Sequence, residues 1–346
     1  MQSCKKELSN GDAIDNNTYS ISKKPDSTTI YVAGGLFTED TATGNVIGHA
    51  IYWRNGIAVP LTTSFSYATS IDISGNDVYV AGMMTTGNSF DKATYWKNGN
   101  AVTLTDGTNN ARATSIVINN DDVYVVGWVT ASTGNIVAAY WKNGVQTLLY
   151  DSNFFSYANS IAVNGNDVFI VGGFMNGHLD SSTVMCWKNG VVLPLTSYPF
   201  SYATAVALNG NDIYIGGVSN DNGYANAATY WKNAVMAPLT VGNFGSQVNS
   251  ITANSDDVYA VGFLNEPNNG LKAAWWLDGA SIPLPGVSGN SYASSVIVNG
   301  QDVYIAGGTN NSFGNDRALY WKNGTAVFLN NGADSTSLYA NGIAVQ

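Results

Sequence analysis

The chain has few charged residues. They make up 11% of its 346 residues, against roughly 25% in a typical globular protein. Glutamate occurs only three times, at Glu7, Glu39 and Glu266. Because exposed helices rely on Glu, Lys and Arg, this composition disfavours a helical fold. The 14 basic and 24 acidic residues give a net charge of −10, so we expect neither nucleic acid nor an anionic membrane surface as a partner.

Long apolar runs and cysteines are also scarce. No run of 18 or more apolar residues occurs, and the sequence therefore predicts no membrane-spanning helix. The two cysteines are Cys4 and Cys186, and neither belongs to a metal-ligand spacing. We predict no metal site, no cofactor and no catalytic residues, since no nucleophile motif such as G-x-S-x-G appears either. Cys186 replaces a tyrosine of a repeated motif, which indicates a packed free thiol.

The first residues, MQSCKKELSNGDAIDNNTYS, place a small residue before Cys4 and a polar, charged stretch after it. This arrangement resembles the mature start of a bacterial lipoprotein, whose cysteine carries the lipid. The resemblance implies lipidation of Cys4 and an extracytoplasmic location, at the outer membrane or cell surface, with residues 1–27 as a flexible tether. The apolar signal segment that should precede the cysteine is missing. A free cysteine in a disordered tail is the alternative.

One sequence unit recurs along most of the chain as an internal repeat. The block DVYVAG ends at Gly82, and its relatives end every 45 residues from there on, whereas the gap before Gly82 is 48 residues. A block of the type YWKNG follows each copy, and a block of the type YAxSIxV belongs to each. Every block occurs seven times, the last YAxSIxV copy being the C-terminal LYANGIAVQ.

Each unit reads as four short strands, called A to D here. In the second unit, they are ATSIDIS, DVYVAGMM, KATYW and AVTLT, with alternating apolar or β-branched residues. Short turns containing Gly-Asn or Asn-Gly join A to B and C to D, as in tight hairpins. A four-stranded unit repeated seven times predicts an all-β, seven-bladed β-propeller over residues 28–346.

The first unit has no good strand A of its own, because SISKKPDST carries two lysines and a proline where apolar residues are needed. We therefore predict that residues 338–346 pair with Thr28–Gly34 and close the ring, which leaves no open sheet edge. A competing interpretation uses Tyr19–Ser22 as that strand. The repeats resemble those of secreted or surface-attached bacterial β-propeller proteins over roughly residues 28–346. This resemblance implies the fold and brings no catalytic residues.

The most regular residues of the repeat indicate architecture. A tryptophan in every strand C is predicted to pack between neighbouring blades, and an aspartate that opens six of the B strands is expected to accept turn N–H bonds. Turn lysines such as Lys97 are interpreted as a solvated rim. The tryptophans are Trp53, Trp96, Trp141, Trp187, Trp231, Trp276 and Trp321, and the aspartates are Asp77, Asp122, Asp167, Asp212, Asp257 and Asp302.

The candidate site is the residue just before strand A, because strand A is innermost and these positions should surround the mouth of the central channel. Five of the seven are tyrosine, which favours a packing role, whereas Arg and Gln suit a half-exposed position with a polar tip in water. Packing and ligand binding are therefore both open. The candidate ligand-binding residues are Tyr67, Arg112, Tyr157, Tyr202, Gln247, Tyr292 and Tyr339.

From these observations we expect a non-catalytic, surface-exposed and monomeric binding module that takes a glycan or peptide at the channel mouth, on the face of the longer B–C and D–A connections. The alternatives are a scaffold for cell-surface proteins and a polysaccharide hydrolase or lyase. An enzyme of the latter kind usually needs two carboxylates on either side of a cleft, and spacing pairs no two acids here. One carboxylate, Asp72, stands out on strand A among apolar equivalents.

Overall fold

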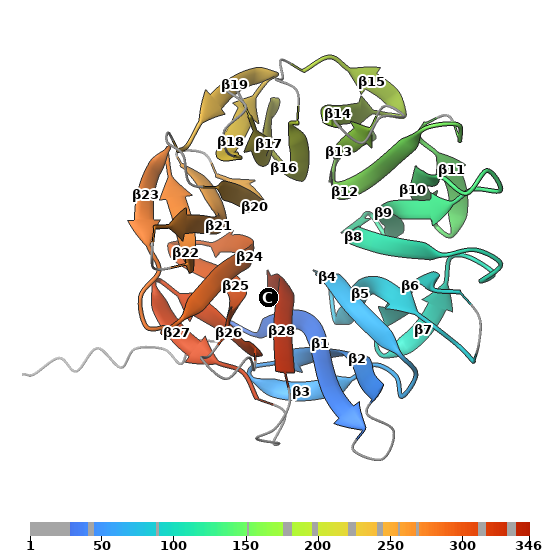
Figure 1. Ribbon diagram of the computed structural model, residues 1–346, viewed down its shortest axis with the longest axis horizontal. Helices are drawn as coiled ribbons and strands as arrows, with labels where there is room; N and C mark the ends of the chain where they lie inside the picture. The colour runs from blue at the N-terminus through green and yellow to red at the C-terminus, as the bar shows by residue number, and fades with distance from the viewer. Residues whose placement is uncertain are drawn as a thin grey trace, which may run out of the picture.

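The computed structural model is a ring of seven four-stranded antiparallel sheets (Figure 1). It describes residues 28–40, 45–87, 90–150, 152–175, 182–195, 200–220, 226–240, 245–254, 257–267, 270–310, 316–330 and 337–346. Within these ranges, strand is the only extended regular structure, and no helix there is long and apolar enough to cross a membrane. The predicted seven-bladed β-propeller is confirmed.

Each blade runs from an inner strand A near the ring centre to an outer strand D at the periphery (Figure 1). Blades 1 to 4 follow one another around the ring. From strand A to strand D, blade 1 consists of β28 (Ser337–Val345), β1 (Ile30–Asp40), β2 (Asn45–Arg54) and β3 (Ile57–Pro60), and blade 2 of β4 (Ser66–Ser74), β5 (Asp77–Met84), β6 (Lys92–Lys97) and β7 (Asn100–Thr103). In the same order, blade 3 consists of β8 (Ala111–Asn119), β9 (Asp122–Thr130), β10 (Ile136–Lys142) and β11 (Val145–Leu148). Blade 4 consists of β12 (Phe155–Asn164), β13 (Asp167–Met175), β14 (Ser182–Lys188) and β15 (Val191–Leu193).

Blades 5 to 7 complete the ring and bring the chain back to blade 1. Their strands, from A to D, are β16 (Tyr202–Asn209), β17 (Asp212–Ser219), β18 (Ala227–Lys232) and β19 (Val235–Pro238); β20 (Ser246–Ala253), β21 (Val258–Glu266), β22 (Gly270–Leu277) and β23 (Ala280–Pro283); and β24 (Asn290–Asn299), β25 (Asp302–Asn310), β26 (Asp316–Lys322) and β27 (Thr325–Phe328).

The predicted closure of the ring is confirmed, because β28 pairs antiparallel with β1 inside blade 1. The register runs from Ile30 opposite Val345 to Phe37 opposite Ser337. The pairing extends beyond the expected end at Gly34 and reaches Phe37. The competing strand at Tyr19–Ser22 and the proposed tether 1–27 lie outside the described residues.

The seven strand-C tryptophans form the centres of the packing between blades. All seven are fully buried. Trp96 of blade 2 packs with Tyr31 and Ala33 of blade 1, and Trp141 of blade 3 packs with Tyr79 of blade 2. Each tryptophan thus joins its blade to the preceding one, as the sequence predicted. Burial of such a side chain contributes roughly 1.5–3 kcal/mol or more to stability. Each repeat therefore supplies the residue that holds it to its neighbour.

Every strand A contains a β-bulge, and in six of the seven the extra residue bonds to the next blade. In β4 the extra residue is Thr69, between Ala68 and Ser70, and its Oγ1 donates to the carbonyl oxygen of Ala113 in the next blade at 2.9 Å. The sequence analysis missed this device. Five further bulge residues make the same kind of bond: Thr114, Asn159, Thr204, Asn249 and Asn341.

The bulge also explains the glycine that ends each DVYVAG block. At Gly127 an added Cβ would overlap the carbonyl oxygen of Arg112, which the bulge pushes toward strand B. The equivalent glycines face the same obstacle from the carbonyl of the residue that was predicted to surround the mouth. Only a residue without Cβ fits such a close backbone approach.

Candidate functional site

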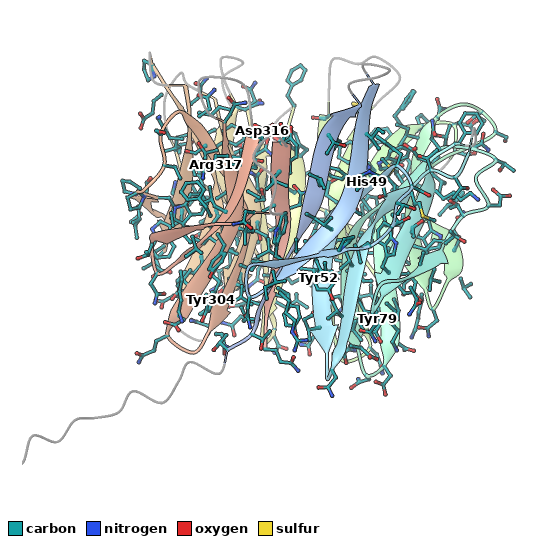
Figure 2. All side chains as sticks on the ribbon, turned by 90° about the horizontal axis from the view of Figure 1, so that it is seen from below. His49, Tyr52, Tyr79, Tyr304, Asp316 and Arg317 are labelled. Atoms are coloured by element: carbon teal, nitrogen blue, oxygen red, sulfur yellow. The ribbon has the colours of Figure 1, made fainter. Side chains whose placement is uncertain are left out.

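The seven candidate residues occupy one structural position. Each lies on an inner strand, two residues before the bulge, between two buried neighbours, and each is itself half-buried. The inner strands surround the ring centre (Figure 1). Asp316, Arg317 and His49 lie toward one end of the ring, called the upper end, and Tyr79 and Tyr304 toward the other, called the lower end (Figure 2).

The first sector of this position joins blades 1, 2 and 3 through aromatic contacts. The ring of Phe37 meets Tyr339 edge-on at 5.2 Å between centroids and lies 6.0 Å from the ring of Tyr67. The guanidinium of Arg112 stands over the ring of Tyr67, 5.3 Å from its centroid. A cation over a tyrosine face is attracted by the negative charge of the ring surface, so this contact holds Arg112 beside Tyr67.

The second sector joins blades 5 and 6 through polar contacts, and Tyr157 of blade 4 lies beside it. Tyr202 Oη donates to Gln247 Oε1 at 2.7 Å, and Gln247 Nε2 donates to Asn249 Oδ1 at 2.6 Å. Burial raises the pKa of Tyr157 to about 12 and also raises the pKa of Tyr202. Both phenols are therefore neutral hydrogen-bond donors at physiological pH.

The third sector gathers Tyr292, Tyr339 and Asp316 near the upper end. Burial raises the pKa of Tyr292, and the nearby carboxylate of Asp316 raises it further. Among the described residues, Tyr292 Oη has no hydrogen-bond partner. Burial, followed by a hydrogen bond to Asp316, raises the pKa of Tyr339. An acid at this sector and a base at Arg112 make the mouth electrostatically uneven.

The seven residues occupy equivalent positions but are not equivalent in their contacts. Adjacent members touch through a cation over a ring, a phenol–amide bond or a shared carboxylate. Ligand binding at these positions therefore stays a prediction. Sequence reasoning could identify the position from its place in the repeat but not the partners, because those come from other blades.

The lower end carries a polar cluster that sequence reasoning misread. Asp77 accepts hydrogen bonds from Lys97 Nζ at 2.8 Å and Asn98 Nδ2 at 2.7 Å, and Lys97 lies over the ring of Tyr79. These partners lower the pKa of Asp77, the bond to Lys97 most of all. The expected turn N–H bonds are wrong: Asn98 Oδ1, not the carboxylate, accepts Val78 N–H.

The same cluster recurs in four more blades. It consists of a strand-B Asp, a strand-C Lys and a turn Asn whose φ is near +50°, a conformation that Asn tolerates better than most residues. The lysines are therefore partners of the aspartates and not only a solvated rim. The sequence already placed the turn lysines and the strand-B aspartates at the same end of the ring, and this proximity of opposite charges could have predicted the ion pairs. The recurring pairs are Lys142–Asp122, Lys188–Asp167, Lys232–Asp212 and Lys322–Asp302.

Comparison with known proteins identifies only the fold. No protein-family model matches the chain, and no curated protein matches its sequence. Among solved structures, the β-propeller domain of the trilobed protease from Pyrococcus furiosus, described as an open velcro topology, is 14% identical with a TM-score of 0.56. The match covers 88% of this chain and 93% of that one. At this identity the likeness shows the propeller architecture.

Two whole peptidases give similar matches. An acylaminoacyl peptidase from Pyrococcus horikoshii is 13% identical with a TM-score of 0.55, over 88% of this chain and 51% of that one. A puromycin-hydrolysing peptidase from Mycobacterium tuberculosis is 13% identical with a TM-score of 0.55, over 89% and 52%. The chain thus spans about half the length of these peptidases.

These matches contradict the expected function. The similar rings belong to peptidases, so the expectation of a stand-alone, non-catalytic surface module for a glycan or peptide is wrong, together with its scaffold and polysaccharide-enzyme alternatives. It failed because half-buried aromatic residues around a ring do not by themselves identify a function. Cys4, the proposed lipidation site, lies outside the described residues.

Proposed function

We propose that the chain is the propeller unit of a peptidase and works beside a separate catalytic unit. The observation that carries the proposal is the similarity to peptidase propellers over 88% of this chain, while about half of the Pyrococcus horikoshii peptidase lies outside the match. A catalytic unit would correspond to the half of that peptidase that the match does not cover. The identity of the peptide substrates is not part of the proposal.

In this proposal the seven candidate residues line the entrance through which peptides reach the catalytic unit. The position offers neutral phenols, an amide and one guanidinium, and these groups match the carbonyl and N–H groups of an extended peptide. The eight paired positions that hold β28 to β1 oppose opening of the ring between its first and last strands. The central entrance is then favoured over a lateral one, which contrasts with an open velcro topology.

The test is peptide hydrolysis by the native assembly. The full chain, tagged in an exposed turn, is isolated from its own cells under native conditions and supplied with fluorogenic peptides of increasing length. We expect hydrolysis that co-elutes with the chain and is lost when the chain is removed by an antibody. Absence of hydrolysis from the isolated material, or hydrolysis unaffected by that removal, would contradict the proposal.

Variants at the entrance distinguish a lining role from a packing role. Tyr67→Ala, Tyr157→Ala and Tyr202→Ala together are expected to change which peptide lengths are cleaved while the assembly stays intact. Asp122→Asn at the lower end is the matched control, because its carboxylate is exposed and lies away from the entrance. An unchanged length preference in the folded triple variant would make the seven residues packing elements.

Surface attachment is a separate proposal that rests on Cys4 alone. A chain with a lipid on this cysteine incorporates labelled fatty acid and partitions with membranes, and a Cys4→Ser variant does neither. Labelling that persists in Cys4→Ser would place the lipid elsewhere, and no labelling of the wild type in its own cells would make Cys4 a free thiol. Neither result bears on the peptidase proposal.

A further inference from the structure

A groove with a volume of about 540 Å³ lies between blades 2 and 3, and none of the seven mouth residues belongs to its described lining. Its walls come from the connection between β7 and β8, the end of β9 and the outer strand β11. Sequence reasoning could not find it, because its two sides belong to different repeats. Its lining includes Asp106, Asn109, Thr130, Ser132, Gln146 and Leu148.

Among the described residues that line the groove, Asp106 is the one that carries a charge. Its Oδ1 accepts hydrogen bonds from the backbone N–H and the hydroxyl of Thr108, at 2.9 and 2.8 Å. These two bonds lower the pKa of Asp106, so the carboxylate is charged at neutral pH. Both bonds use the same oxygen. The backbone N–H of Asp106 itself also contributes to lowering this pKa. Oδ2 accepts neither of the bonds from Thr108 and can pair with a cation.

The rest of the lining is uncharged and polar above an apolar floor. Leu104, Val129 and Leu148 contribute apolar side chains, while the side chains of Asn109 and Gln146 have no hydrogen-bond partner among the described residues. None of the described residues that line the groove is aromatic, so they offer no stacking surface of the kind that a sugar ring would use. A metal ion is also disfavoured, since the described residues contain no group of three or more His, Cys, Asp or Glu suited to hold one.

We propose that this groove binds a primary ammonium group on a short polar chain, supplied by a lysine side chain or by the amino terminus of a peptide. The ammonium pairs with Asp106 Oδ2, and the chain that carries it lies along Gln146 and Asn109 above the leucines. An ammonium group has three donors and no acceptor, and a charge-assisted bond to a carboxylate is stronger than a neutral one. The inference goes beyond the proposed function, because it requires neither a catalytic unit nor the ring mouth.

Lys92 provides a built-in check on the proposal. Its side-chain carbons lie against Gly107, and its charge contributes to lowering the pKa of Asp106. The native lysine therefore competes with an incoming ammonium group for the field of the same carboxylate. Lys92→Met keeps the apolar part of the side chain and removes the charge. A site for a cation gains affinity from this change, whereas a site for an anion or a neutral molecule does not.

The experiment measures binding of three fluorescently labelled hexapeptides to the full chain by anisotropy at low salt. One has a free amino terminus and no lysine, one is acetylated and contains a single lysine, and one is acetylated without lysine. We expect the third peptide not to bind. Binding of the first peptide identifies the terminal amine as a source of the ammonium group, and binding of the second identifies the lysine side chain. Equal binding of all three, or no binding of any, would overturn the proposal.

Variants fix the position of the binding site. Asp106→Asn is expected to weaken binding about tenfold, the equivalent of about 1.4 kcal/mol, and Lys92→Met to tighten it about threefold. Asp122→Asn at the lower end is the control and leaves the affinity unchanged. Unchanged affinity in a folded Asp106→Asn variant, or weaker binding by Lys92→Met, would overturn the proposal. Loss of peptide hydrolysis by the native assembly would contradict the peptidase proposal without affecting these results.

Discussion

The two ends of the ring treat repetition differently. At the lower end, the same Asp, Lys and Asn side chains meet at the same distances in five blades. At the upper end, seven equivalent positions hold different partners: a ring contact for Arg112, an amide for Tyr202 and a carboxylate for Tyr339. A repeated residue with repeated contacts serves the fold, whereas a repeated residue with varied contacts leaves room for a function.

The largest expected effect concerns the glycine that ends each DVYVAG block on strand B. Gly127→Ala places a Cβ against the carbonyl oxygen of Arg112, which the bulge holds in place. Because backbone cannot move aside as a side chain can, we expect a loss of about 3 kcal/mol or more in the free energy of unfolding, measured by urea denaturation.

The control for this prediction is Gly245→Ala, since an added Cβ there meets no atom within 4 Å. Surface substitutions of this kind usually change stability by less than about 0.5 kcal/mol. If Gly127→Ala is as mild as Gly245→Ala, the bulge does not constrain the strand and the explanation of the repeat glycine is wrong.

A smaller effect is expected at Asp72, the departure from the apolar pattern of strand A. Its Oδ2 accepts the N–H of Ile118 in the next blade at 2.7 Å, and its Oδ1 accepts the N–H of Ile73 at 2.8 Å. Asp72→Asn leaves one buried N–H facing an amide NH₂, and removal of a buried acceptor costs about 1–3 kcal/mol. Thermal unfolding of the variant measures this loss.

The pH dependence of Asp72→Asn has a definite sign. Burial raises the pKa of Asp72 above its usual value of 3.8, against the opposing effect of its two N–H donors. The folded state therefore binds the proton more tightly than the unfolded state, and the resulting stabilisation is present below pH 3.8 and lost as pH rises through the folded pKa. The stability difference between wild type and variant should accordingly shrink from acid to neutral pH. A difference that grows would contradict the raised pKa.

At the upper end, loss of one varied contact is expected to cost about 1 kcal/mol. Tyr202→Phe removes the hydroxyl that donates to Gln247 and leaves that amide oxygen without its donor. Tyr157→Phe is the matched comparison, because the structure assigns Tyr157 no side-chain hydrogen bond among the described residues. Equal unfolding midpoints in urea for the two variants would show that the phenol–amide bond does not contribute.

The smallest effect is expected at the lower end of blade 6, where Leu277 and Asp278 replace the lysine and asparagine of the cluster. Leu277→Lys restores a cation beside Asp257 and Asp278, and we expect a slight rise in the unfolding temperature that disappears in high salt, as for exposed ion pairs. Lys97→Met in blade 2 tests the reverse change. A rise that survives high salt would mean that packing, not charge, distinguishes this blade.

The sequence was sufficient for features that each repeat specifies by itself. Alternating apolar residues and the Asn-Gly turns predicted the four strands, and the missing first strand predicted the pairing of β28 with β1. It was insufficient for features made by two repeats together. The bond from Thr69 to Ala113 and the groove around Asp106 depend on how neighbouring blades twist against each other, which a one-dimensional pattern does not encode.

The predicted mouth positions were located correctly on the inner strands, but their contacts could not be derived. Tyr67 touches Phe37 and Arg112, which lie in the two flanking blades. Nothing in the repeat distinguishes this tyrosine from Tyr157. Functional inference from a repeat protein therefore needs the neighbour relations as well as the motif, and the expected function was wrong where it used the motif alone.

The pairing of β28 with β1 also governs the order of events when the chain folds. Blades 2 to 7 each consist of strands that are contiguous in sequence, so each can form from local hairpins soon after it is made. Blade 1 has to wait for strand β28, because Ile30 pairs with Val345. Contacts between such distant residues slow folding. Until β28 has been made, blade 1 therefore presents an unpaired strand edge to its surroundings, and such an edge favours aggregation.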